Sequence, residues 1–376
     1  MTPLESLIIL NALPNVGSVK IRLLIEHLGS ADGALSASQA ALARVAGIGE
    51  QIAHDIANWR EHLKDPSKEL EAAAAAGLQV ISFYDHAYPV NLKEIYDPPI
   101  VLYVRGTLEE RDRHAIAIVG TRRTTNYGRT TASRLARDLV ANGFTVVSGL
   151  ALGIDAAAHL GALEGGGRTI AVLGSGFARF YPPENIGLAD QIAENGAVIS
   201  EFHMDCAPTK NNFPIRNRVI SGLALGVVVA EAPTDSGAMI TATHALSQNR
   251  QVFAVPGRTD FPTFKGNHRL IKEGAKLVES AEDVLTEFDY LFPQGLALAG
   301  ATKAQPSSNA AARPRPNLEG AEADVYKALD GEQRHIEEIV QSCGLPPGEV
   351  SVALLSLEMK HLVKQLPGKY YVRLGL

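Results

Sequence analysis

Six short apolar runs recur through the middle of the chain, between residues 80 and 290. Each run is followed by a turn and then by a segment whose apolar residues recur at helical spacing. Strands that alternate with helices in this way are typical of a parallel sheet covered by helices on both faces. The pattern therefore predicts an α/β fold with an extended, doubly wound, Rossmann-like parallel sheet. The runs begin at His114, Phe144, Thr169, Ala197, Gly226 and Gln251.

The pattern changes on both sides of this region. The first 75 residues are mostly helical in pattern, with the turns P-N-V-G and A-G-I-G, which resemble those of helix-hairpin-helix or SAM-like domains. Residues 291–318 are rich in Ala, Pro, Ser and Gly without a period, as flexible linkers are. The last segment has three short helical patterns and a final strand pair, which predicts a winged helix. We therefore expect a helical domain at 1–75, a sheet domain at 80–290, a linker at 291–318 and a winged-helix domain at 319–376.

The two flanking domains carry weak indications of DNA binding. Helix-hairpin-helix turns bind the DNA backbone through exposed N–H groups. Acidic residues such as Glu26 and Glu50 lie near these turns, so DNA binding and a structural or protein-contact role stay equally open. The C-terminal segment is acidic in balance, and the helix that would enter a DNA groove contains no arginine. We expect the winged helix to contact proteins or to form a dimer interface.

Composition restricts the kind of partner. The chain has 376 residues, 46% of them hydrophobic, a formal net charge of −6 and a pI of about 6.0. Any nucleic-acid site must therefore be a local basic patch. The two cysteines lie far apart and give neither a disulfide framework nor a zinc spacing. The N-terminus lacks a basic region, and glycines interrupt the most apolar stretch, Val219–Ala232. These features predict a cytoplasmic protein without a membrane span.

The segment N-N-F-P-I-R-N-R, residues 211–218, combines an aromatic ring with positive charge. Phe213 follows Lys210 and precedes Arg216 and Arg218. Cations beside a flat ring can hold a single nucleic-acid strand, because the cations bind phosphates and the ring stacks a base of any identity. Alternatively, the ring packs into the core and the arginines bond local carbonyl groups. The segment alone leaves both interpretations equally open.

Glycine-rich turns follow three of the expected strands. The first contains Gly120 with Arg122 and Arg123, the second runs from Ser148 to Asp155, and the third is G-S-G from Gly174. Glycine lets the backbone approach a ligand closely, and each following helix offers free N–H groups to an anion. Turns at the carboxyl edge of one sheet line a common crevice. Together with the Phe213 segment, the three turns favour an anion site.

The sequence gives little indication of a nucleotide cofactor, a metal site or a catalytic residue. The first strand is not followed by G-x-G-x-x-G, and G-x-x-x-x-G-K-[ST] is absent from the sequence, which disfavours NAD and P-loop nucleotide binding. Asp155 and His159 have helical spacing, but no third ligand is placed, so a capping acid and a polar packing pair are expected rather than a metal site. Ser236 and Gly237 either offer N–H groups to a phosphate or cap a helix. We predict no catalytic residue, metal or cofactor.

The motifs resemble those of the DprA/Smf family of DNA-processing proteins. The strings I-V-G-T-R-R, S-G-L-A-L-G-I-D, A-V-L-G-S-G, N-F-P-I-R-N-R and V-F-A-V-P-G occur in the order typical of that family, and the resemblance covers residues 80–285 densely. The chain departs from the family pattern at two places on the expected pocket rim. The chain has F-A-R-F-Y-P after Gly176 where the family often has an acidic residue, and Phe264 where the family has serine.

The resemblance implies a recombination mediator that binds single-stranded DNA, forms a homodimer, protects incoming DNA during natural transformation and loads the RecA recombinase. It implies that Arg122 and Lys210 hold neighbouring phosphates and that Phe213 stacks a base. Arg216, Asn217 and Arg218 would shape and charge the pocket. The complete expected site comprises Gly120, Thr121, Arg122, Arg123, Ser148, Gly149, Gly153, Lys210, Asn212, Phe213, Arg216, Asn217, Arg218, Ser236 and Gly237.

Two alternatives belong to other functional classes. One is a nucleotide or nucleoside hydrolase or transferase that uses Asp155 or Glu231 in the same crevice. The sequence offers carboxylates at strand and helix ends but lacks a G-G-x-G-T-x-x-E loop. The other alternative is a scaffold that contacts proteins through its two flanking domains, and it predicts no salt-sensitive DNA binding.

Overall fold

The computed structural model describes residues 1–61, 65–288, 318, 320–329, 334–360, 362–366 and 369–373. The chain divides into two compact units, Met1–Ala299 and Gly300–Leu376, and each is considered by itself. Of the expected linker, only Leu318 lies within the described residues. Over these residues, every helix is too short or too polar to cross a lipid bilayer.

A nine-stranded sheet forms the centre of the first unit, in the order β1-β2-β6-β5-β4-β3-β7-β8-β9. The neighbours from β6 to β9 pair in parallel, whereas β2 pairs antiparallel with β6 and β1 antiparallel with β2. The doubly wound parallel sheet is thus confirmed, and the antiparallel pair extends it at one edge. The strands are β1 (Gln79–Ser82), β2 (Val101–Gly106), β3 (Ala115–Gly120), β4 (Thr145–Ser148), β5 (Thr169–Val172), β6 (Gly196–Ser200), β7 (Gly226–Glu231), β8 (Gln251–Ala254) and β9 (Lys276–Leu277).

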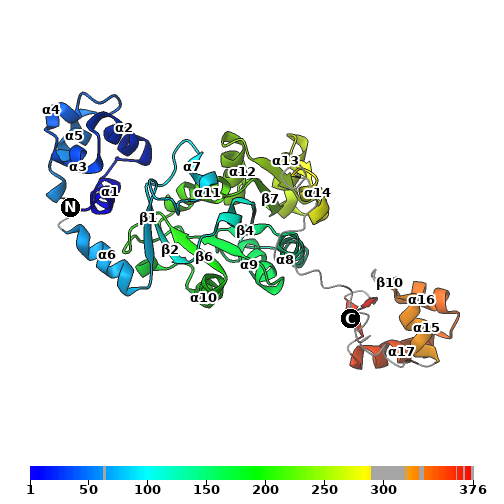
Figure 1. Ribbon diagram of the computed structural model, residues 1–376. Coiled ribbons are helices and arrows are strands. Elements are labelled where there is room, and N and C mark those ends of the chain that lie inside the picture. Colours follow the sequence, from blue (N-terminus) through cyan, green and yellow to red (C-terminus); the bar gives the residue numbers. More distant parts are fainter. Residues whose placement is uncertain are drawn as a thin grey trace. The chain divides into compact units, whose positions relative to one another are not determined.

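Helices cover both faces of the sheet (Figure 1). In β3, Ile116 and Ile118 pack towards the face of helices α8 and α9, whereas Ala117 and Val119 pack towards the face of α11 and α12. Because both faces are buried, the central strands carry apolar residues on both faces, and polar residues occur mainly at the strand ends. One face carries α8 (Asn126–Ala141), α9 (Ile154–Glu164), α10 (Ile186–Glu194) and α14 (Ala281–Leu285), and the other α7 (Val90–Lys93), α11 (Asn212–Leu223), α12 (Gly237–Ser247) and α13 (Lys265–Lys272).

The strand order reverses between β3 and β7. The chain runs outward from β3 through β4, β5 and β6, and then returns to place β7 on the other side of β3. Helices that follow neighbouring strands then diverge to opposite faces, which opens a crevice at the carboxyl ends of the strands. This is the point at which the fold can hold a ligand.

A buried carboxylate fixes the turn at this point. Glu231, the last residue of β7, is fully buried. Its Oε2 accepts hydrogen bonds from the Thr125 N–H at 2.9 Å and from the hydroxyl groups of Thr124 and Thr125 at 2.7 and 2.9 Å. Thr125 caps helix α8. Glu231 therefore joins strand β7 to the start of the helix that follows β3.

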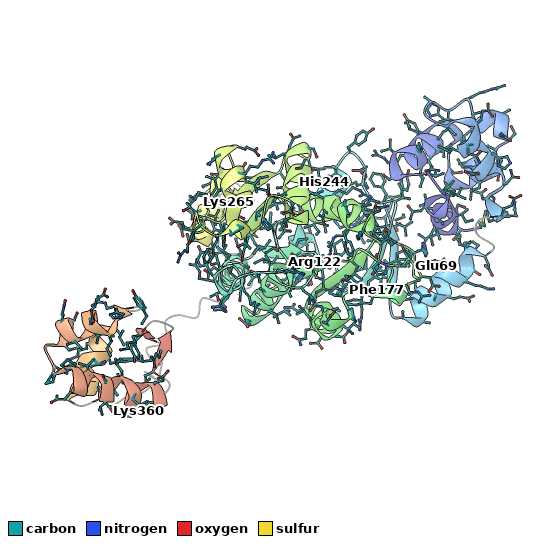
Figure 2. All side chains as sticks on the ribbon, turned by 180° about the vertical axis from the view of Figure 1, so that it is seen from behind. Glu69, Arg122, Phe177, His244, Lys265 and Lys360 are labelled. Atoms are coloured by element: carbon teal, nitrogen blue, oxygen red, sulfur yellow. The ribbon has the colours of Figure 1, made fainter. Side chains whose placement is uncertain are left out.

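The N-terminal helices share a hydrophobic core with the edge of the sheet. Val101 and Tyr103 of β2 are buried in the same cluster as Trp59 and the apolar residues of the first helices. Glu69 (Figure 2) accepts hydrogen bonds from the Tyr103 hydroxyl at 2.8 Å and from the Met204 N–H at 2.7 Å. This shared core explains why both parts fall within one compact unit. The helices are α1 (Pro3–Ala12), α2 (Ser18–Leu28), α3 (Ala31–Ser36), α4 (Gln39–Leu42), α5 (Glu50–Ala57) and α6 (Pro66–Ala75).

In its described residues, the second unit combines three helices with a small antiparallel sheet of order β10-β12-β11, the arrangement of a winged helix. Lys360 (Figure 2) lies 2.6 Å from Glu322 and links the ends of α17 and α15. The elements are α15 (Ala321–Ala328), β10 (Arg334–His335), α16 (Ile336–Cys343), α17 (Pro347–Met359), β11 (Val363–Leu366) and β12 (Tyr370–Arg373).

Asn267 of helix α13 forms hydrogen bonds with the carboxyl ends of strands β7 and β8. Its Nδ2 donates to the carbonyl groups of Val229 and Val255 at 2.8 and 2.9 Å, and its Oδ1 accepts the Ala232 N–H at 2.7 Å. Asn267→Ala leaves these buried groups unpaired, so we expect the free energy of unfolding to fall by about 3 kcal/mol or more. Urea titration measures this decrease. Asn195→Ala, which removes one exposed hydrogen bond, should change stability by less than about 1 kcal/mol.

Candidate functional site

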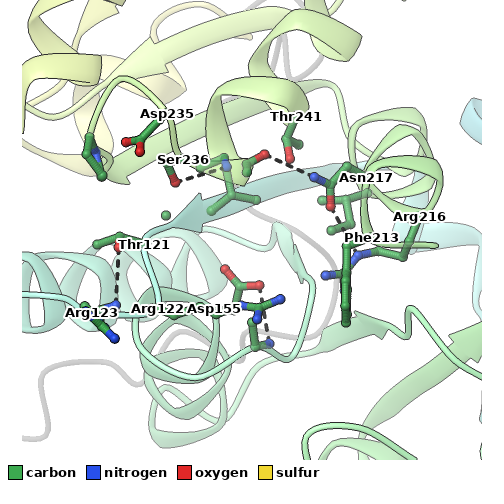
Figure 3. A pocket seen from close by; sticks show the side chains of 17 residues that line it. Thr121, Arg122, Arg123, Asp155, Phe213, Arg216, Asn217, Asp235, Ser236 and Thr241 are labelled. Carbon is green, nitrogen blue, oxygen red and sulfur yellow. Dashed lines mark hydrogen bonds between the residues drawn. The ribbon is translucent and has the colours of Figure 1, made fainter. Parts of the chain in front are cut away.

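A pocket of about 380 Å³ opens at the carboxyl edge of the sheet, where the strand order reverses (Figure 3). The turn after β3, the start of α9, the first turns of α11 and the start of α12 form its walls. The structure brings nine of the expected site residues together here. They are Gly120, Thr121, Arg122, Arg123, Phe213, Arg216, Asn217, Ser236 and Gly237.

The Phe213 ring is half-buried in the first turn of helix α11. It lies against Gly174 in the turn after β5, where an added Cβ would come within 2.8 Å of the ring. The Arg122 guanidinium carbon is 4.9 Å from the ring centre, and the Tyr181 ring centre is 5.9 Å away. Glycine at position 174 thus makes room for an aromatic ring at the pocket wall, next to a cation.

Arg122 and Arg123 are exposed in the turn between β3 and α8. The Arg123 N–H donates to the Thr121 hydroxyl at 3.2 Å, which closes the turn. A Cβ on Gly120 would lie 2.5 Å from Ile154 Cγ1 of helix α9. Gly120, which also lines the pocket, therefore allows this helix to pack closely against the end of β3.

Arg216 lies beneath the pocket and is 4% exposed. Its Nη1 donates to the carbonyl oxygens of Gly149 and Val172, at the ends of β4 and β5, and its Nε donates to Asn217 Oδ1 at 3.2 Å. Burial lowers the pKa of this guanidinium to about 10, although the Asp155 carboxylate raises it. Burial likewise raises the pKa of the Asp155 carboxyl, and Arg216 opposes that rise. A buried positive charge thus forms part of the pocket floor.

The other expected residues lie outside the lining of this pocket. The buried Ser148 hydroxyl donates to the Ile118 carbonyl at 2.6 Å, and Asn212 Nδ2 donates to the Ala207 carbonyl at 3.1 Å. Arg218 forms ion pairs with Asp97 and Glu201, so its charge is compensated inside the protein. The remaining three are the exposed Lys210, which precedes α11, and the glycines of the turn after β4, Gly149 and Gly153.

Comparison with protein families identifies the chain. The family model described as DNA recombination-mediator protein A matches residues 79–289, more than half of the sequence. The chain belongs to the DprA/Smf family. A second family model, the DprA winged helix domain, matches residues 309–369, which confirms the winged-helix prediction.

Relatives of known sequence and structure agree with this assignment. Protein Smf of Synechocystis is 37% identical, over 95% of this chain and 96% of that protein. DprA of Bacillus subtilis is 44% identical over 58% of this chain and 74% of its own length. The X-ray structure of DprA from Streptococcus pneumoniae superposes with a TM-score of 0.66 at 36% identity, covering 76% of this chain and 98% of that one.

A further DprA structure, from Helicobacter pylori, is described as giving insights into that protein's single-stranded DNA binding mode. It superposes with a TM-score of 0.51 at 31% identity and covers 56% of this chain and 96% of its own. The motif resemblance to the DprA/Smf family is thereby confirmed.

The carboxylates considered for catalysis and the histidine considered for a metal site have structural partners in this DprA/Smf protein. Glu231 accepts hydrogen bonds from Thr125, the capping residue of α8, and Glu201 pairs with Arg218. His159 is fully buried with Nδ1 2.7 Å from the Thr169 hydroxyl, and burial lowers the pKa of its ring to about 3. Within the described parts of the chain, no three His, Cys, Asp or Glu side chains are grouped as metal ligands.

Sequence reasoning missed two polar residues that line the DprA/Smf pocket and one aromatic residue beside it. Asp235 and Thr241 line it, and Tyr181 lies next to Phe213. Asp235 stands next to the expected Ser236 and Gly237, so its position in the sequence could have revealed it. Tyr181 belongs to the F-A-R-F-Y-P segment that the family resemblance assigned to the pocket rim, but its contact with Phe213 depends on the fold, which brings the turn after β5 to the start of α11.

The buried contacts of Arg216 should contribute strongly to the stability of the fold. Arg216→Ala removes the donor to two buried strand ends and leaves Asp155 without its compensating charge. We expect the free energy of unfolding to fall by about 3–5 kcal/mol, as when one partner of a buried charge pair is removed. Thermal or urea unfolding measures this decrease. Arg123→Ala, which truncates an exposed arginine of the same pocket, is the matched control and should unfold like the wild type.

Proposed function

We propose that this protein binds single-stranded DNA in the pocket and acts as a recombination mediator. The observation that carries the proposal is the half-buried Phe213 ring with the exposed Arg122 guanidinium 4.9 Å from its centre. A π face and a cation at one site suit a ligand in which flat bases alternate with phosphates. Membership of the DprA/Smf family, with a relative described as binding single-stranded DNA, supports the same ligand.

The pocket accommodates such a ligand without reading its sequence. A phosphate is held by Arg122 and by the N-terminal ends of α11 and α12, where backbone N–H groups and the helix dipoles favour an anion. Lys210, three residues before Phe213, holds the neighbouring phosphate. The base stacks on the Phe213 ring, and every base has a π face to offer.

The wider role follows the family. We infer that the protein is a cytoplasmic homodimer that protects incoming strands and loads RecA onto them during natural transformation. Helix α17 exposes the apolar side chains of Val352 and Leu355, which suits a protein contact better than a DNA groove. We expect no catalytic step, metal or cofactor.

Arg122→Ala and Lys210→Ala should change the salt dependence of binding, because each variant leaves one phosphate without its cation. We expect weaker binding to a labelled single strand. The slope of log K against log salt should flatten by roughly 0.7 for each phosphate that is no longer neutralised. Fluorescence anisotropy over a salt series, with duplex as competitor, measures both effects. Arg113→Ala, at the amino end of β3, is the control. Slopes identical to the control in both variants would exclude the assigned phosphate contacts.

Substitutions of Phe213 separate stacking from packing. Phe213→Ala should weaken single-strand binding by about 1–3 kcal/mol, whereas Phe213→Tyr and Phe213→Trp should retain most of the affinity. Phe213→Leu is the sharpest comparison, because leucine keeps an apolar contact with Gly174 but has no π face. We expect Phe213→Leu to bind as poorly as Phe213→Ala while unfolding near the wild-type temperature. If Phe213→Leu binds like the wild type, the ring has no stacking role.

A further inference from the structure

A second concavity, of about 760 Å³, lies between helices α8 and α9 (we call it the arginine groove). It meets the pocket at Arg122, which lines both concavities. Arg129, Arg134 and Arg137 follow one another along α8. With a rise of about 1.5 Å per residue, these cations stand roughly 5–8 Å apart along the helix.

The opposite wall of the arginine groove is apolar. Ala156 and Leu160 lie one turn apart on α9, and Leu152 from the turn before α9 lines the same wall. Leu152 is 41% exposed and Leu160 is 44% exposed. The groove thus pairs a row of cations with a row of apolar side chains along its whole length.

The charges differ between the two concavities. The pocket is lined by three arginines and two aspartates, whereas the arginine groove is lined by four arginines and one glutamate. Glu164 pairs with Arg137 at 2.7 Å. Arg134 donates to the backbone carbonyl of Glu279 at 2.8 Å, and this neutral group does not compensate the positive charge of the guanidinium. In the described residues, the ion pairs involve neither Arg129 nor Arg134. On a chain with a net charge of −6, this is a local excess of positive charge.

We propose that the arginine groove holds the continuation of the DNA strand that enters the pocket. Phosphates lie along Arg129 and Arg134 on α8, and the bases face Leu152 and Leu160 on α9. This inference rests on the proposed function and extends it, since Arg122 becomes the point at which the strand passes from the pocket into the groove. The binding site then spans several nucleotides beyond the one stacked on Phe213.

The chemistry of the groove favours a single strand. A single strand carries phosphates on one side and unpaired apolar base faces on the other, which matches the two walls. In a duplex the bases are stacked inside and cannot reach Leu152 and Leu160. An acidic protein segment would match the arginines, and the experiment below includes it as a competing outcome.

The test compares short and long strands on the full-length protein. Oligothymidylates of about 4 and about 16 nucleotides span the site sizes of small single-strand-binding domains. The wild type should bind the long strand more tightly and with a steeper salt slope. Arg129→Ala/Arg134→Ala should bind the short strand like the wild type. Its affinity for the long strand should fall roughly tenfold, and its salt slope should flatten by roughly 1.4, the value for two phosphates.

Controls separate charge from structure. Arg129→Ala alone, which spares the contact of Arg134 with Glu279, should flatten the long-strand slope by roughly 0.7, and Arg129→Lys should restore it. Arg113→Ala, at the opposite edge of the sheet, should match the wild type for both strands. Melting temperatures for each variant show that the fold is intact.

Three outcomes would overturn the inference in distinguishable ways. If lengthening the strand increases the affinity of the double variant as much as that of Arg113→Ala, the groove does not hold DNA, although the pocket still can. If the double variant binds DNA like the wild type but no longer binds a polyglutamate peptide, the groove serves an acidic protein segment. If the wild type binds neither strand, or if Arg122→Ala leaves short-strand binding unchanged, the proposed function itself fails.

Discussion

The buried guanidinium of Arg216 is the interaction on which the site depends. A charge removed from water is costly unless hydrogen bonds and an opposite charge compensate it. Arg216 obtains this compensation from the carbonyl groups that end β4 and β5 and from the nearby Asp155. These partners come from separate turns at the carboxyl edge. Keeping Arg216 satisfied therefore fixes those turns relative to helix α11, and with them the position of Phe213.

The arginines near the site divide into two groups with different tasks. Arg216 and Arg218 are almost entirely buried and bond to carbonyl groups or carboxylates. Arg122 and Arg123 are exposed at the pocket. Only the exposed pair is free to exchange water for a phosphate. Of the two interpretations of the Phe213 segment, the structure bears out that its arginines bond internal groups, while its ring stays half exposed at the pocket.

The sequence predicts the parallel sheet well because each central strand is apolar on both faces and is followed by a helical pattern. It does not predict β1 and β2, since their positions depend on pairing between distant segments, β2 with β6. The same limit applies to side chains. The glycine turns and the Phe213 segment can be recognised locally, and seven of their expected site residues do line one pocket, together with Ser236 and Gly237. The partners of Arg218, Asp97 and Glu201, come from elsewhere in the chain, as does Tyr181. The arginine groove arises only when α8 and α9 lie side by side.

Because the N-terminal helices and strand β2 share one core, the compact unit of the structure begins earlier in the chain than the region that the family model matches. Sequence similarity to the family model begins at residue 79, just where β1 begins. In the folded chain, however, Val101 and Tyr103 are buried by helices that precede that point. A chain shortened to the matched region would carry an apolar face into solvent at the edge of its sheet, a surface prone to self-association. The region matched by the family model is therefore smaller than the compact unit, in which the preceding helices cover the edge of the sheet.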